Sequence, residues 1–210
     1  MIKVLGLHID FSDRCPLCGG KDCARFIEYY YRGVIDEKGT YYKAFPVARY
    51  LCRGKGAAVI VRHRTFSLLP YQLIPYVKYS IPFIIGMLKK VYGEGRSVRE
   101  LLDYLARAET GQYIDLSSST FHGLRRFILK CIDKMLAMGF YKDNQSAFQS
   151  SAEKQRIMVF VVFSENFSYK GSSLIRGPCA LGYHFYMQCG GYLKNGHFLF
   201  GTPSQFRQIG

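Results

Sequence analysis

The chain of 210 residues is long enough for one or two small domains and shorter than most multidomain enzymes. Its hydrophobic content of 49% and aromatic content of 16%, with 17 Tyr and 16 Phe, argue against a mainly disordered chain. The formal net charge of +14 indicates a polyanionic partner, for which nucleic acid ranks before an anionic membrane.

Cysteine usage and the N-terminal sequence indicate the compartment. Seven cysteines is an odd number, and the start Met-Ile-Lys-Val lacks the basic and apolar regions of a signal peptide. We therefore expect a reducing, cytoplasmic setting without disulfides. The most apolar window, residues 74–87, is interrupted by two prolines, a lysine and a glycine, so no membrane-spanning helix and no membrane partner are predicted.

A Cys-x-x-Cys pair, Cys15 and Cys18, marks the segment around which we expect the chain to be organised. This spacing places two thiolates on one tight turn, and a structural zinc ion takes four N or S ligands. Cys52 supplies a third thiolate, and His63 is our choice for the fourth ligand. Cys23 is the alternative fourth ligand, so the sequence leaves both ligand sets open.

Between Cys18 and Cys52 the sequence predicts a β-hairpin. Two runs rich in aromatic and β-branched residues, 26–34 and 40–51, flank the turn Asp36-Glu37-Lys38-Gly39. The hairpin returns the chain from the first cysteine pair to Cys52, as a zinc ribbon requires. A third strand is predicted at 57–61, ahead of His63.

Basic residues alternate with tyrosines in this region, and residues 1–95 carry 15 Lys/Arg against 7 Asp/Glu. Cations neutralise phosphates, and tyrosine rings stack on bases or sugars. The interleaved tyrosines are Tyr29, Tyr30, Tyr31, Tyr41 and Tyr42. The nucleic-acid contacts predicted here are Arg49, Arg53, Lys55, Arg62 and Arg64.

Three helices are predicted after an extended, proline-containing connector. Ser80 caps the first, which has Pro82 in its first turn and ends near residues 93–95. The second begins at the capping box formed by Ser97 and Glu100 and runs to about residue 108. The third follows the hydroxyl-rich residues 117–120 and ends at Gly139.

The third helix has the strongest helical periodicity of the chain, with an apolar face from Phe121 to Leu136. Three short helices of which the last has a basic outer face fit a helix-turn-helix, whose third helix lies in the major groove. The connection over residues 109–118 is longer than the usual turn, so a plain helical bundle is the alternative. The DNA contacts predicted on this helix are His122, Arg125, Arg126 and Lys130.

Beyond Asp143 the pattern is less informative. The apolar run Ile157–Phe163 fits a buried strand and a buried helix equally well. We therefore expect an α+β fold in three parts: a zinc-ribbon-like domain at 1–70, a helical helix-turn-helix-like domain at 71–142, and an aromatic and glycine-rich tail of unassigned fold at 143–210.

Three stretches carry a family resemblance: Cys15-Pro-Leu-Cys18-Gly19-Gly20, Arg49-Tyr50-Leu51-Cys52-Arg53 and His63-Arg64-Thr65-Phe66-Ser67-Leu68-Leu69-Pro70. Together they resemble the amino-terminal zinc ribbon of bacterial insertion-sequence transposases and of small uncharacterised relatives, over about residues 12–140. The resemblance implies a ribbon and a helix-turn-helix that bind element DNA, with Cys15, Cys18 and Cys52 as zinc ligands. Many ribbons have a second cysteine pair where this chain continues from Cys52 with Arg-Gly-Lys-Gly, so His63 is carried over only provisionally.

A complete transposase also needs a ribonuclease-H-like domain with three metal-binding carboxylates. After residue 140 the acidic residues are Asp143, Glu153 and Glu165, which lie within 23 residues of one another and leave no room for such a domain. The predicted function is zinc-stabilised DNA binding without a catalytic domain. RNA binding or protein interaction through the ribbon is the first alternative, and a metal-dependent nuclease or recombinase is the second.

Overall fold

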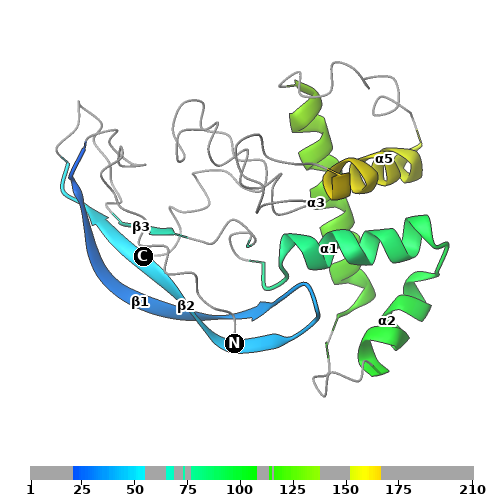
Figure 1. Ribbon diagram of the computed structural model, residues 1–210, viewed down its shortest axis with the longest axis horizontal. Coiled ribbons are helices and arrows are strands. Elements are labelled where there is room, and N and C mark those ends of the chain that lie inside the picture. Colours follow the sequence, from blue (N-terminus) through cyan, green and yellow to red (C-terminus); the bar gives the residue numbers. More distant parts are fainter. Residues whose placement is uncertain are drawn as a thin grey trace.

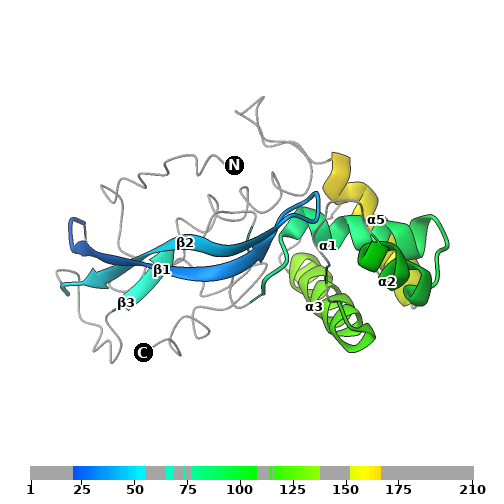
Figure 2. The same ribbon diagram turned by 90° about the horizontal axis from the view of Figure 1, so that it is seen from below.

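The computed structural model describes residues 21–54, 65–68, 73, 77–107, 114, 116–137 and 152–166. The described residues form a three-stranded sheet and a group of helices, which confirms the α+β class. The two parts lie side by side, and the turn of the β-hairpin reaches the helices (Figures 1 and 2). The predicted ligands Cys15, Cys18 and His63, the cations Lys55, Arg62 and Arg64, and the strand predicted at 57–61 all lie outside the described residues.

The predicted hairpin is confirmed by strands β1 (Ala24–Ile35) and β2 (Tyr41–Cys52), which pair in antiparallel register. The Asp36 carboxylate closes the turn by accepting hydrogen bonds from the backbone N–H groups of Lys38 at 2.9 Å and Thr40 at 2.8 Å. Such local bonds from an Asp side chain favour a turn over continued strand. A short third strand, β3 (Thr65–Leu68), pairs with β2 and gives the order β1-β2-β3.

The two faces of the sheet differ in chemistry. One face buries Val34, Phe45 and Val47 with Leu73 in a small apolar cluster. Strand β1 has a β-bulge at Ile27, which is an extra residue without a partner on β2. The bulge changes which side chains of β1 point to the same face of the sheet.

As a result, three aromatic side chains of β1 share that second face, and we call Phe26, Tyr29 and Tyr31 the aromatic face. Phe26 and Tyr29 pair with Tyr50 and Ala48, which are two residues apart on β2 and therefore project to the same side.

Backbone hydrogen bonds join the hairpin to the helical part. The N–H of Ile35 donates to the carbonyl oxygen of Lys78 at 2.6 Å, and the N–H of Ser80 donates to that of Ile35 at 2.9 Å. The Arg32 guanidinium donates to the Val77 carbonyl oxygen, and burial lowers the pKa of Arg32. The turn end of the hairpin is therefore fixed to the start of the first helix.

The predicted starts of the first two helices are confirmed, and the third helix begins within the hydroxyl-rich residues 117–120 that were predicted to precede it. Helix α1 (Ile81–Leu88) is capped by Ser80, whose Oγ accepts from the N–H of Phe83 at 3.4 Å, and continues as the π-helical turn η1 (Lys89–Gly93). Helix α2 (Val98–Arg107) begins with the capping box, in which Ser97 N–H donates to Glu100 Oε2 at 2.9 Å and Glu100 N–H donates to Ser97 Oγ at 3.2 Å. Helix α3 spans Ser118–Ala137.

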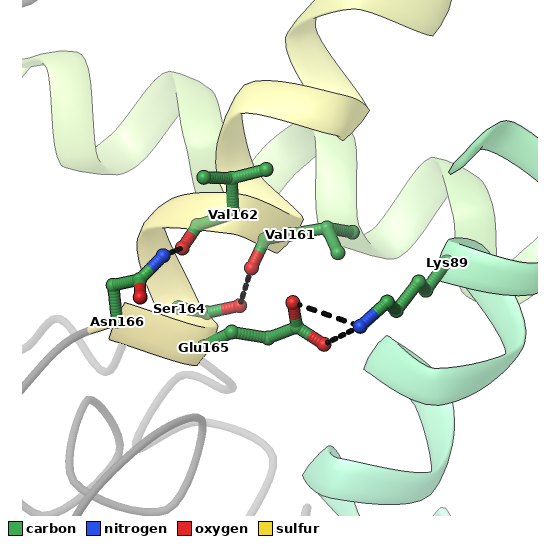
Figure 3. Close-up of polar contacts among 6 residues, drawn as sticks. All are labelled: Lys89, Val161, Val162, Ser164, Glu165 and Asn166. Atoms are coloured by element: carbon green, nitrogen blue, oxygen red, sulfur yellow. Dashed lines mark hydrogen bonds and ion pairs between the residues drawn. The ribbon is translucent and has the colours of Figure 1, made fainter.

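The apolar run after residue 156 is helical, which decides between the two predicted alternatives. It lies in α5 (Glu153–Asn166), where Ile157, Phe160, Val161 and Ser164 are buried. Their spacing of three and four residues is that of one helical face. Ser164 is the polar residue of this buried face. Its Oγ donates a hydrogen bond to the carbonyl oxygen of Val161 at 2.9 Å, so the buried hydroxyl has a partner (Figure 3).

Helix α5 packs on α1, η1 and α3, and α3 crosses behind α1 and α5 in Figure 1. Side chains from four helices are fully buried in one shared core: Ile84, Leu101, Ile128, Ile132 and Phe160. At the edge of this core Lys89 Nζ lies 2.9 and 3.2 Å from the two carboxylate oxygens of Glu165 (Figure 3). Among the described helices none is long and apolar enough to cross a bilayer.

Alanine substitutions at two glycines test this packing, because they should change the free energy of unfolding in opposite directions. Gly39 has φ of +84°, and a Cβ there lies 2.9 Å from Ile114 Cδ1, whereas no described atom lies within 4 Å of a Cβ at Gly86 in α1. We expect Gly39→Ala to lower the free energy of unfolding by about 1–2 kcal/mol. Gly86→Ala should raise it by about 0.5–1 kcal/mol, because alanine loses less backbone entropy in a helix. Urea unfolding followed by circular dichroism measures both, and changes of the same sign would contradict the described turn.

Candidate functional site

Two buried cysteines lie at the open end of the hairpin. Cys23 and Cys52 are 1% and 2% exposed. Strand pairing places Ala24 opposite Cys52, and the N–H of Arg53 donates to the carbonyl oxygen of Cys23 at 2.7 Å. Cys23, which precedes β1, and Cys52, the last residue of β2, thus lie at the same end of the sheet.

The sulfur of Cys52 has a backbone hydrogen-bond donor. Its Sγ accepts a hydrogen bond from the N–H of Gly54 at 3.3 Å, and Gly54 has φ of +71°, a conformation that glycine adopts without strain. Thiols are among the ligands that zinc prefers, so Cys52 stays a predicted zinc ligand.

The structure describes two cysteines of one predicted ligand set, Cys23 and Cys52, and one cysteine of the other, Cys52. Cys52 is common to both, and the alternative ligand Cys23 lies at the same end of the sheet. Over residues 21–54, 65–68 and the described helices, no group of three or more His, Cys, Asp or Glu side chains could hold a metal. A complete site would need Cys15 and Cys18, which precede the described part of the chain.

The predicted nucleic-acid contacts on the hairpin have different surroundings. Arg49 is engaged within the sheet, because its Nη1 lies 2.9 Å from Glu28 Oε1 and its guanidinium lies 4.9 Å from the centre of the Tyr30 ring. Arg53, next to the buried thiol of Cys52, is exposed. Of these two, Arg53 is the side chain available to a phosphate.

Helix α3 separates its predicted contacts into two groups. His122, Arg126 and Lys130 are exposed and follow one another at intervals of four residues, so they form a single line on the helix surface. We call these three residues the basic stripe. In the described part of the chain no ion pair involves the basic stripe, whereas Arg125 pairs with Glu153 of α5 at 3.6 Å.

The fourth predicted contact, Arg125, therefore faces the α5 side of α3. A hydrogen bond with Tyr92 of η1 raises the pKa of Arg125, and the Glu153 charge adds to this. Nearby, the Arg156 guanidinium of α5 pairs with the Asp133 carboxylate of α3. These contacts make Arg125 part of the α3–α5 interface.

Of the three acidic residues after residue 140, the structure describes Glu153 and Glu165, and these two lie far apart. Glu153 and Glu165 lie at opposite ends of α5, about 18 Å apart along the axis at 1.5 Å per residue. Glu153 pairs with Arg125 and Glu165 with Lys89. Two metal ions acting together sit about 4 Å apart in hydrolytic sites, so these two side chains cannot share such a site.

A hollow lies between the hairpin turn and helices α1 and α2. Its apolar floor includes Phe83, Met87 and Leu101. Its rim mixes acidic and basic side chains: Glu37, Lys38, Lys90, Glu100, Asp103 and Arg107. This mixture favours neither an anionic nor a cationic ligand.

Of the aromatic face, Tyr29 and Tyr31 are among the tyrosines predicted to stack on bases or sugars, whereas Phe26 was not predicted. The signal of this face in the sequence was the run of tyrosines at 29–31, but the alternation of a regular strand would have placed Phe26 and Tyr29 on opposite sides. The bulge at Ile27 brings them together.

In comparisons with known proteins, the chain matches no protein-family model, no curated protein and no solved structure.

Proposed function

We propose that the chain is a zinc-stabilised nucleic-acid-binding protein that engages duplex DNA, comparable to the DNA-binding part of a transposase. The observation that carries this proposal is the basic stripe of α3, His122, Arg126 and Lys130. These side chains are exposed, while the opposite face of the same helix is buried in the core. A basic, solvent-facing helix on a rigid body is the element that DNA-binding domains place in the major groove.

The geometry of the basic stripe suits a phosphate backbone or base edges. Residues four apart on a helix rise about 6 Å per step, so the stripe extends over about 12 Å. Burial of Ile128 and Ile132, both 0% exposed, fixes the rotation of α3 and with it the direction of the stripe. Arginine forms paired hydrogen bonds with guanine or phosphate oxygens, which assigns Arg126 the strongest single contact.

The hairpin contributes a second anchor in this proposal. Zinc held by Cys15, Cys18 and Cys52, with Cys23 or His63 as fourth ligand, cross-links the open end of the hairpin. That cross-link fixes Arg53, which directly follows Cys52, as a further phosphate contact. The location of the buried Cys23 and Cys52 at one end of the sheet supports this role.

We expect the double substitution Arg126→Ala/Lys130→Ala to weaken binding of a duplex oligonucleotide. Removing two phosphate contacts at 0.15 M salt costs roughly 30-fold in affinity, because each contributes about 0.9 to the salt slope. Fluorescence anisotropy with a labelled duplex of mixed sequence measures the change.

The matched control is Arg99→Ala/Arg107→Ala, which removes the same charge from two exposed positions of α2. Its affinity should stay within about threefold of the unmodified chain, since only the overall field changes. If the two double variants weaken binding equally, the effect is one of net charge and α3 is not the contact surface.

A further inference from the structure

We infer that the aromatic face, Phe26, Tyr29 and Tyr31, binds unpaired bases of single-stranded nucleic acid by stacking. This inference rests on the proposed function for the class of ligand and adds a second mode of binding at a different surface. The three side chains are 42%, 56% and 66% exposed. Large aromatic rings left open on a sheet are a feature of ligand surfaces, because burial in the core would stabilise the fold more.

Contacts within the sheet hold part of this surface in place. The rings of Phe26 and Tyr29 have centroids 4.9 Å apart, and those of Phe26 and Tyr50 have centroids 5.7 Å apart. Tyr50 in turn stacks on Phe66 of β3 at 5.7 Å with an interplanar angle of 19°. Phe26, Tyr50 and Phe66 are direct partners across the three strands, so this row is anchored on the buried Phe66.

The residues of β2 that lie opposite the two tyrosines have small side chains. The partners of Tyr29 and Tyr31 on β2 are Ala48 and Pro46, which are small and lie on the same face. Small neighbours leave room for a planar group beside the exposed tyrosine rings.

The spacing along β1 matches a nucleotide stack. Residues two apart on an antiparallel strand are separated by about 6.8 Å. Successive stacked bases repeat at about 3.4 Å, so the separation of Tyr29 and Tyr31 along β1 is about two base steps. Bases in a duplex are already paired and stacked, so unpaired bases are the ones free to stack on these rings.

The excess of basic residues in the hairpin region favours an anionic partner for this surface. Residues 21–54 hold seven Lys/Arg and four Asp/Glu. Two of the four acids are engaged internally: Glu28 by Arg49, and Asp36 by the backbone of the turn. Residues 21–54 also expose five cations: Lys21, Arg25, Lys38, Lys43 and Arg53. Aromatic rings and cations on the same element form the combination that single-strand binders use for bases and phosphates.

The test uses the full chain and a fluorescently labelled oligothymidine of 12 nucleotides, with a duplex of equal length measured in parallel. We expect Tyr29→Ala/Tyr31→Ala to lower single-strand affinity about tenfold or more per ring, because stacking is worth that much per base. Duplex affinity should stay unchanged. Tyr29→Phe/Tyr31→Phe, which keeps the ring faces, should retain single-strand affinity within about twofold.

Tyr104→Ala is the control for loss of an exposed tyrosine elsewhere, since Tyr104 lies on α2 and is 47% exposed. It should leave single-strand binding unchanged. An oligouridine of the same length shows whether the strand is DNA or RNA, and tighter binding of either one supports stacking.

Single-strand affinity that survives the double alanine substitution overturns the inference, as does a phenylalanine pair that loses as much as the alanine pair. The outcome is separable from that of the proposed function. If tyrosine-dependent single-strand binding occurs without duplex binding, the role of α3 fails and this surface stands. If duplex binding depends on Arg126 and Lys130 while oligothymidine is not bound, the reverse holds.

Discussion

Phe160→Ala is expected to lower the free energy of unfolding by about 3–5 kcal/mol, which is a large part of the stability of a typical domain. Phe160 is 0% exposed and belongs to the shared core of α1, α2, α3 and α5. Removing its ring leaves a cavity that neighbours from several helices cannot fill together. Urea unfolding followed by circular dichroism and by tyrosine fluorescence measures the loss.

Val162→Ala is the matched control on the same helix, because Val162 is 51% exposed. Its effect should stay within about 0.5 kcal/mol, as for most surface substitutions. Phe160→Leu keeps most of the buried volume, so its loss of free energy of unfolding should lie between those of Phe160→Ala and Val162→Ala. A Phe160→Ala variant within about 1 kcal/mol of the unmodified chain would mean that α5 does not belong to this core.

Cys52→Ser is expected to abolish zinc binding and to unfold the open end of the hairpin. Structural zinc in small domains contributes about 10–16 kcal/mol of apparent binding free energy at neutral pH, so loss of a shared ligand has a large effect. Native mass spectrometry should show one zinc per unmodified chain and none in the variant. Hydrogen exchange at the paired ends Ala24 and Cys52 should rise in parallel.

Cys131→Ser is the control for loss of a buried thiol, because Cys131 lies in α3 within the helical core. It should retain zinc. Cys23→Ser and His63→Ala separate the two ligand sets, since the true fourth ligand is the one whose substitution releases the metal. Retention of zinc by Cys52→Ser would contradict both sets.

Much of the local structure follows from the sequence because its determinants are local. The Asp36-to-Gly39 turn, the Ser80 cap and the Ser97/Glu100 capping box each depend on residues within four positions of one another. Periodicity likewise predicts the buried face of α3, since the same side chains define the pattern and the contact.

Other features depend on contacts between distant segments. The bulge at Ile27 follows from how β1 pairs with β2, so alternation along β1 alone misplaces Tyr29 relative to Phe26. The role of Arg125 follows from Glu153 and Tyr92 on other helices. A helical periodicity in α3 places Arg125 near the basic stripe but cannot reveal its partners.

The same reason explains the apolar run in α5. A run of seven apolar residues fits a strand or a helix, and its state is decided by the partners that bury it. Here α1, η1 and α3 provide a surface for Ile157, Phe160 and Val161. A segment beyond the predicted helix-turn-helix thus completes the core that orients α3.

The central claim, that the chain binds nucleic acid through its cations, is tested most directly by the salt dependence of duplex binding. Fluorescence anisotropy titrations between 50 and 200 mM salt give the slope of log affinity against log salt. Three phosphate contacts, from Arg53, Arg126 and Lys130, predict a slope of about −3 or steeper. An affinity that does not change over this range, or no binding at 50 mM salt, would contradict the claim.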